Sequence, residues 1–194
     1  MIRSELCTLA RMSVADFNAY LAGGELPFET TGGEVRDAQG RVWSNFGLPH
    51  AVALLAAQQL VAAGLNWREA AWTLREPRVP VPRSTTSPQG EHFVARAEFE
   101  RDGGGAPEFR PRVTVYAGPL GDIILAVRRE VESYNRQSAR TSWQRISLSA
   151  LVACDLARAR RVTDARAEEM GLAPEQVLRL DPDAEVGPSK SQSR

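Results

Sequence analysis

The stretch SELCTLARMSVADFNAYLAGGELPF, residues 4–28, decides how the first part of this chain folds. Apolar residues recur at helical spacing from Leu6 to Ala10, and the four residues ARMS then interrupt the pattern. Ser13 is a favourable N-cap for a second helix over residues 14–21, and a pair of glycines follows that helix. Two helices joined by so short a break must cross steeply and share one small core, which predicts a helix-turn-helix.

A hairpin and two further helices are predicted after this pair. In GGEVRDAQGRVWS, residues 32–44, apolar positions flank the polar turn DAQG, where Gly40 suits a positive φ. The stretch LPHAVALLAAQQLVAAG, residues 48–64, is almost continuously apolar and predicts a buried helix that begins near a proline and ends at a glycine. Asn66 suits the first position of a capping box for a short helix over residues 67–75. The tryptophans of this part are expected mainly in the core: Trp43, Trp67 and Trp72.

The second half of the chain begins after a proline-rich segment. Residues 77–90, PRVPVPRSTTSPQG, hold four prolines and predict an extended linker between a domain of residues 1–76 and a domain of residues 91–180. Alternating patterns on either side of DGGGAPEF predict a second hairpin, and helical spacing predicts a helix directly after it. Residues 147–170 repeat the helical spacing among arginines, which predicts a basic amphipathic helix. Residues 181–194 are expected to form a disordered tail, and the predicted fold class is α+β.

Composition excludes several classes of protein. The chain has 194 residues, and a hydrophobic content of 43% is enough to bury a core. Its 24 basic and 24 acidic residues give a formal net charge of zero, so no overall positive field points to a nucleic acid. The first residues lack the apolar core of a signal peptide, and no stretch is apolar for long enough to span a bilayer. We therefore expect a cytoplasmic protein that does not enter a membrane.

The residue types that carry catalysis or bind metals are sparse. Cys7 and Cys154 stand far apart, and only His50 and His92 could join them, so neither a metal site nor a disulfide framework is expected. Neither histidine has a nucleophile or carboxylate partner nearby in the sequence, and DGGG at residues 102–105 lacks the context of a phosphate-binding loop. We expect no catalytic residue, no cofactor and no enzymatic activity.

The order of the elements over residues 2–76 resembles that of the MerR-like regulators and their shortened relatives among the phage excisionases. The matching segments are SELCTLARMSVADFNAYLAGGELPF, RDAQGRVWS and LPHAVALLAAQQLVAAGLNWREAAWTL. The resemblance implies a bacterial winged helix-turn-helix that binds double-stranded DNA and regulates transcription. Proline residues replace the long coiled coil through which sensor members of this family dimerise. The full expectation is therefore a winged helix-turn-helix followed by a small α+β domain with a β-hairpin and two long helices.

The resemblance also implies which residues meet DNA. A helix fits the major groove of B-DNA, and a hairpin beside it can reach the backbone. The helix over residues 14–21 would enter the groove, where Asn18 could pair with an adenine edge and Tyr20 with a phosphate. The six expected DNA-binding residues are Arg11, Ser13, Asn18, Tyr20, Arg36 and Arg41. Apolar residues of the same helix are expected in the core: Val14, Phe17 and Leu21.

The charge of the first 76 residues opposes tight binding by a single copy. They contain six arginines and eight acidic residues, whereas affinity for duplex DNA depends largely on neutralised phosphates. Residues 136–170 hold seven arginines and four acidic residues, and this basic patch could touch DNA or an acidic protein. We expect a homo-oligomer, such as a dimer, whose C-terminal domain mediates oligomerisation or binds a protein partner. Two alternatives stay open: an excisionase-like architectural or recombination factor, and a protein-interaction adaptor that has lost DNA binding.

Overall fold

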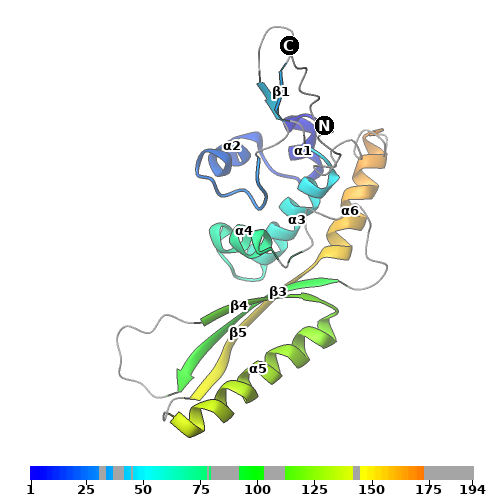
Figure 1. Cartoon of the computed structure of the whole chain (residues 1–194). Coiled ribbons are helices and arrows are strands. Elements are labelled where there is room, and N and C mark those ends of the chain that lie inside the picture. The colour runs from blue at the N-terminus through cyan, green and yellow to red at the C-terminus, as the bar shows by residue number, and fades with distance from the viewer. Residues whose placement is uncertain are drawn as a thin grey trace, which may run out of the picture.

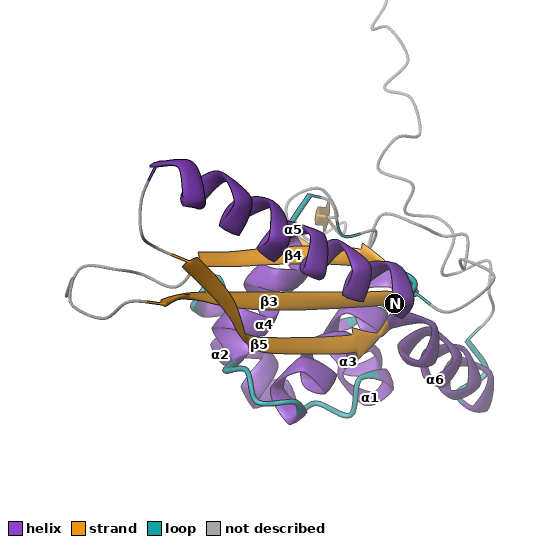
Figure 2. Cartoon of the chain, turned by 90° about the horizontal axis from the view of Figure 1, so that it is seen from below, coloured by secondary structure: helices purple, strands orange, loops and turns teal. Residues whose placement is uncertain are grey.

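The computed structural model describes residues 1–30, 34–36, 42–44, 46–77, 79, 92–102, 112–141 and 145–172. A helical layer lies against one side of a three-stranded sheet, and a long helix lies against the other side (Figure 1, Figure 2). This arrangement confirms the α+β class predicted from the sequence. The elements of the first part are α1 (Arg3–Leu9), α2 (Val14–Ala22), β1 (Glu34–Arg36), β2 (Val42–Ser44), α3 (Leu48–Ala62) and α4 (Trp67–Arg75).

The helix pair at the start of the chain forms where the sequence predicts it. Ser13 caps α2, because its Oγ accepts a hydrogen bond from the Asp16 backbone N–H at 3.0 Å. Gly24, with φ of 65°, follows the end of α2 in the left-handed conformation that glycine adopts readily. Phe17 is fully buried and meets the ring of Phe46 edge-to-face, so α2 is anchored on the segment that leads into α3.

The hairpin and the next two helices also follow the prediction. β1 and β2 pair antiparallel, with Val35 opposite Trp43, although Gly40 and the rest of the expected turn lie outside the described residues. The N-cap of α3 is Gly47, and its N–H donates to Nδ1 of His50 at 2.9 Å. α4 begins with the predicted capping box, in which Asn66 and Glu69 each bond the backbone N–H of the other.

Trp72 departs from the expectation that the tryptophans are core residues. It stands on the outer face of α4 and is 49% exposed, because the inner face of this short helix is filled by smaller residues such as Ala70, Ala71 and Leu74. Trp67 is half-buried and packs against the core as expected, and its indole N–H donates to the backbone oxygen of Glu25 at 2.8 Å.

The second part of the chain forms a sheet with the strand order β4-β3-β5, in which both pairs are antiparallel. The expected second hairpin is confirmed as β3 (Phe93–Asp102) and β4 (Arg112–Gly118), and the helix after it as α5 (Leu120–Thr141). The remaining elements are β5 (Arg145–Asp155) and α6 (Leu156–Glu169).

The helix predicted over residues 147–170 is wrong in its first part, because residues 145–155 form β5 and only the rest is helical. Leucines three residues apart, Leu148 and Leu151, suit one face of a helix. In a strand they would normally point to opposite faces. The pairing of β5 with β3 is irregular between Glu98 and Phe99, and the extra residue on β5 returns both leucines to one face. A β-bulge therefore produces a spacing that resembles a helix.

Two hydrophobic clusters lie on the two faces of the sheet. One lies between the sheet and α5 and contains Phe99, Ile123, Val127 and Ile146 with two alanines of β3. The other is larger and joins the helical layer to the sheet, since it includes Phe17 of α2, Leu54 of α3, Val94 of β3 and Leu156 of α6. Most of the proline-rich segment of residues 77–90, and all of residues 181–194, lie outside the described residues. The described parts of the two halves thus share one core.

Candidate nucleic-acid interface

The outer side of α2 is the candidate DNA-reading surface. Phe17 faces the core, whereas Asp16 and Asn18 on the same helix are exposed. Val14 is 43% exposed, contrary to the expectation that it is a core residue, because it lies in the first turn, where the chain enters α2 from the solvent side. Leu21 is half-buried and packs against the core, as predicted. The helix therefore presents a mixed polar and apolar outer face.

Asn18 is held in place by an arginine that the sequence analysis did not single out. Its side-chain oxygen accepts a hydrogen bond from the Arg3 guanidinium at 2.8 Å, and the same guanidinium lies 5.9 Å from the centre of the Phe17 ring. Arg3 is exposed on α1 and lies fifteen residues away in sequence. No local spacing rule connects these residues, so only the crossing of α1 and α2 reveals the pair.

Arg11 and Ser13 occupy the turn between α1 and α2. Arg11 is exposed and has φ of 49°, a left-handed conformation that costs a non-glycine residue about 1 kcal/mol or more. A glycine would adopt this conformation without that cost. Ser13 is engaged locally, because its hydroxyl also donates to the Asp16 carboxylate at 2.6 Å. Ser13 therefore acts first as a helix cap, whereas Arg11 has no ion-pair partner within the part of the chain that the structure describes.

A second arginine reaches this turn from the far end of the chain. Arg166 of α6 donates from its guanidinium to the backbone oxygen of Leu9, the last residue of α1, at 2.6 Å. Burial lowers the pKa of Arg166, and the positive charge of Arg11 lowers it further. Glu169 acts on Arg166 in the opposite direction, so this turn brings two guanidinium groups together with a carboxylate nearby. The sequence analysis noted a basic patch around Arg166 but could not place it beside α1.

Tyr20 is less available than expected. Its ring stacks on Trp67 of α4, with the ring centres 4.2 Å apart and the planes inclined by 14°. It also packs against the core and is half-buried. One face of the ring is therefore committed to packing, and a phosphate contact through its hydroxyl stays a prediction.

The two predicted hairpin contacts are only partly within the described residues. Arg36 is the last residue of β1 and pairs with Val42 across the hairpin. Arg41 lies outside the described residues. The role of both arginines stays a prediction.

An arginine and tryptophan surface on α4 was missed by the sequence analysis. Arg68, Trp72 and Arg75 are exposed and recur at intervals of four and three residues, which places them on one face of α4. Arg68 pairs with the Glu25 carboxylate at 2.8 Å, and Arg75 donates to the backbone oxygen of Gly24 at 2.8 Å. These contacts join α4 to the end of α2, and both helices lie on the side of the molecule away from α6 (Figure 1).

Neither cysteine thiol in the described part of the chain is activated. Burial raises the pKa of the Cys154 thiol to about 12, and it raises the pKa of the Cys7 thiol as well, so both thiols are poor nucleophiles. Among the described residues, no three of His, Cys, Asp and Glu are grouped as a metal site would require. The described helices include none with the length and apolar character needed to cross a bilayer.

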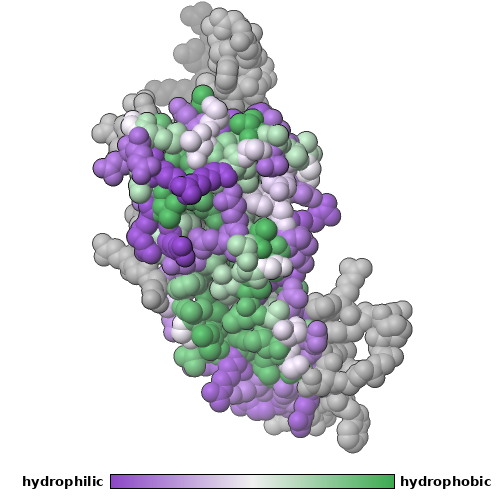
Figure 3. All heavy atoms as spheres, turned by 180° about the vertical axis from the view of Figure 1, so that it is seen from behind, coloured by the Kyte–Doolittle hydropathy of each residue, from purple (hydrophilic) through white to green (hydrophobic). Residues whose placement is uncertain are grey.

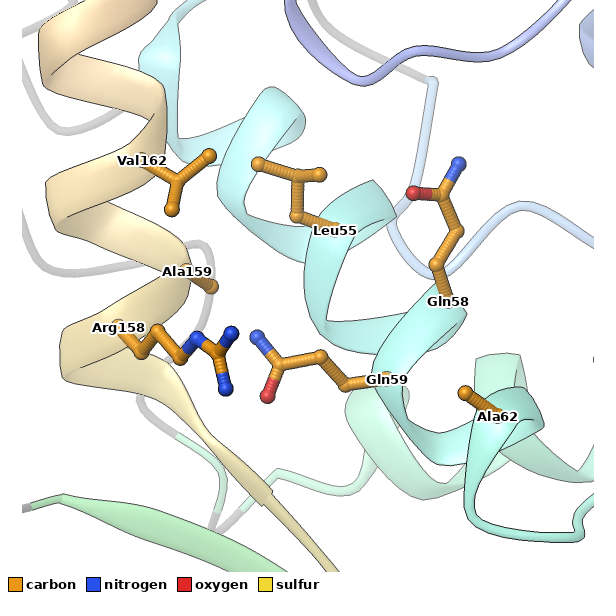
Figure 4. A pocket seen from close by; sticks show the side chains of 7 residues that line it. All are labelled: Leu55, Gln58, Gln59, Ala62, Arg158, Ala159 and Val162. Atoms are coloured by element: carbon orange, nitrogen blue, oxygen red, sulfur yellow. The ribbon is translucent and has the colours of Figure 1, made fainter.

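A small groove lies between α3 and α6 (Figure 4). Its volume is ≈ 220 Å³, and its walls are mostly apolar, with Leu55 and Val162 facing each other across it. Gln59 at its edge is already occupied, because its amide bonds both the N–H and the oxygen of Asp155. The groove therefore lies where α6 packs beside α3, and Arg158 is the charged residue among those that line it.

No protein-family model matches this chain, and no curated protein matches it either.

Proposed function

We propose that this protein is a sequence-specific regulator that binds double-stranded DNA through a MerR-like winged helix-turn-helix. The observation that carries the proposal is the surface around α2, where exposed polar side chains lie beside a turn that holds Arg11 and Arg166. Such a helix can enter the major groove, while cations at its entrance neutralise phosphates of the flanking backbone. The hairpin of β1 and β2 follows α2 in the chain, as the wing of this module requires.

The conformation of Arg11 adds support. Strained backbone positions cluster at functional sites, and glycine would remove the strain at this turn. Asn18 supports base reading in a similar way, because Arg3 orients its amide at no cost to its exposed N–H groups. Arg68 and Arg75 on α4 extend the cationic surface beyond the end of α2.

The test is a fluorescence-polarisation titration of the full chain with fragmented genomic duplex DNA at two salt concentrations. We expect measurable binding at low salt that weakens steeply at high salt, because counterions are released from neutralised phosphates. Arg11→Gly should weaken binding about tenfold while leaving the stability unchanged or slightly higher, since it removes a phosphate contact and relieves the backbone. Asn18→Ala should reduce the preference for the best fragment over random DNA by about 1–3 kcal/mol.

Arg128→Ala is the matched control. Arg128 is an exposed arginine on α5, far from α2, and its ion-pair partner among the described residues is Glu132, one turn away. It should bind DNA as the unmodified chain does. Absence of binding at low salt, or equal losses in Arg11→Gly and Arg128→Ala, would overturn the proposal and favour an adaptor that has lost DNA affinity.

A further inference from the structure

The outer edge of β5 exposes apolar residues at the sheet end of the molecule. β5 pairs with β3 on one side only, so its other side is an edge of the sheet (Figure 2). Residues 146–154 between its two ends carry no charged side chain and no proline. Natural edge strands usually contain such residues, because an unprotected edge is a template for pairing with another strand.

The two ends of this edge are covered by side-chain amides. The N–H and the oxygen of Ile146 bond the amide of Asn135 from α5, at 2.8 and 3.0 Å. At the other end, the N–H and the oxygen of Asp155 bond the amide of Gln59 from α3, at 3.0 and 3.4 Å. A residue of an antiparallel strand directs both backbone groups to the same side, so Ile146 and Asp155 face away from β3.

The middle of the edge is left open. Backbone N–H and C=O groups of every second residue of an antiparallel strand point to the same side. Starting from Ile146, the next outward residue is Leu148. Going back from Asp155, the outward residues are Ala153 and Leu151. The irregular pairing between Glu98 and Phe99 supplies the one extra residue that reconciles the two counts. Within the described ranges, no strand lies beside these outward groups.

The side chains of the same residues form an apolar surface. Leu148 lies opposite Phe99 and Leu151 opposite Ala97, and both partners belong to the cluster under α5. The two leucines therefore lie on the α5 face of the sheet, yet they are 40% and 36% exposed because α5 does not extend over them. Figure 3 shows apolar side chains gathered over the sheet end of the molecule on this side.

One residue of α5 continues this apolar surface. Ile124 is 51% exposed and precedes Asn135 by eleven residues, which is close to three helical turns. Since Asn135 reaches β5, Ile124 lies on the flank of α5 that faces the same strand. Ile124 thus adds an exposed apolar side chain on the β5 side of α5.

We propose that the open edge of β5 binds the same edge of a second copy of this chain, antiparallel and about a two-fold axis. An antiparallel edge is complementary to itself under a two-fold rotation, so the outward N–H and carbonyl of Leu148 on one copy can meet those of Leu151 on the other, across the bulge that each strand carries. The two sheets would join into one sheet of six strands. Leu148 of one copy would then pack beside Leu151 of the other, between the two α5 helices.

The charges at the ends of β5 favour this partner and this direction. Arg145 begins the strand and Asp155 ends it, so antiparallel approach avoids bringing like charges together, although the Asp155 carboxylate also caps α6 and lies 4.0 Å from Arg161. A nucleic acid is excluded as the occupant, because the middle of the edge offers no cation to a phosphate. The inference stands on the sheet edge and does not depend on DNA binding by α2.

The test measures the mass of the full chain in the absence of DNA, by sedimentation velocity over about 1–100 µM. The unmodified chain should form a dimer within this range. Leu151→Lys places a charge in the middle of the edge and should weaken the dimer by at least about tenfold. Leu125→Lys is the control, because Leu125 is 50% exposed but lies two residues from the buried Ile123, on the side of α5 away from the sheet. It should dimerise as the unmodified chain does.

Amide hydrogen exchange on the unmodified chain gives a second measurement that does not depend on a variant folding. The outward amides of Leu148 and Leu151 should be protected at high concentration and exchange rapidly on dilution. The inward amides of Val152 and Cys154, which face β3, should show no such dependence. A monomer at every concentration, or a dimer in which Leu151→Lys and Leu125→Lys behave alike and the outward amides exchange freely, would overturn the inference. Because no DNA is present, this failure is separate from failure of the DNA-binding proposal.

Discussion

The surface around α2 and the edge of β5 differ in the kind of partner that each can satisfy. The first carries Arg3, Arg11 and Arg166 around exposed polar side chains, whereas the middle of β5 carries no charge and exposes two leucines. The charged and polar groups around α2 stay hydrated until a charged partner replaces the water. The open backbone groups of β5, which lie beside leucines, form hydrogen bonds when another strand pairs with them. The proposed DNA contact and the proposed dimer contact therefore use two surfaces of different chemistry.

The helical end of the molecule, which contains α2, and the sheet end, which contains β5, are nevertheless parts of one folded unit. The larger hydrophobic cluster includes residues from α2, α3, β3 and α6, and Arg166 joins α6 to the end of α1. Buried Arg96 of β3 adds an ionic connection, since it pairs with Glu69 of α4 at 3.2 Å and with Glu98 at 2.8 Å. We therefore expect that each surface depends on the stability of the whole chain.

The largest expected effect tests whether the two ends unfold together. Phe17 in the helical layer and Phe99 under α5 are both fully buried. Phe17→Ala and Phe99→Ala should each lower the free energy of unfolding by about 3–5 kcal/mol, because each leaves a cavity in a packed core. In urea, circular dichroism and tryptophan fluorescence should follow one shared transition in both variants. Separate transitions, with Phe99→Ala shifting only one of them, would show that the ends are independent.

A smaller effect is expected at the junction of the ends. Arg96→Met should lower the free energy of unfolding by about 2 kcal/mol, because it removes two ion pairs from a largely buried site. This figure is below the usual cost of breaking a buried pair, since both carboxylates remain partly hydrated. The matched control is Arg128→Met on the surface of α5, which should change the stability by less than about 0.5 kcal/mol. Equal effects in urea titrations would argue against a connection through Arg96.

An effect confined to the helical end is expected at Ser13. Ser13→Ala removes the side-chain acceptor of the Asp16 N–H and should cost about 1 kcal/mol in urea unfolding. Ser13→Asn keeps an acceptor and should restore most of this loss. If Ser13→Asn were as unstable as Ser13→Ala, capping would not be the role of this residue.

The smallest effect at neutral pH is expected at His50. Burial lowers its pKa below the ordinary value of 6.5, and its neutral Nδ1 accepts the Gly47 N–H. The unfolded chain therefore takes up a proton more readily, so the stability is complete above pH 6.5 and falls as the pH drops below it. His50→Asn keeps an acceptor but does not titrate, and its thermal unfolding should depend less on pH between about 7 and 5. An unchanged dependence would assign the acid sensitivity to other groups.

The elements of the helical end were predicted closely because their signals are local. Ser13, Asn66 and Gly24 cap or end helices through contacts within three or four residues, and such contacts can be read from a single chain. The partners of these helices were not predicted. Arg3 beside Asn18 and Arg166 beside Leu9 are brought together over fifteen and 157 residues, and no spacing rule relates residues so far apart.

At the sheet end, the secondary structure itself was predicted less well. The alternating residues of β3 and β4 predicted a hairpin, but β5 was interpreted as a helix, because a bulge gives Leu148 and Leu151 the spacing of a helix face. Its free edge could not be foreseen either, since an edge is defined by the order of strands in the sheet.

The sequence by itself determined the α+β class, the capped helices of the first part and the first hairpin of the sheet, because propensity, capping and periodicity act over a few residues. The tertiary structure decided that β5 is an edge strand, that Arg166 stands at the turn between α1 and α2, and that Trp72 is exposed. These outcomes depend on which distant surfaces bury one another, and that choice is made by the packing of the whole chain.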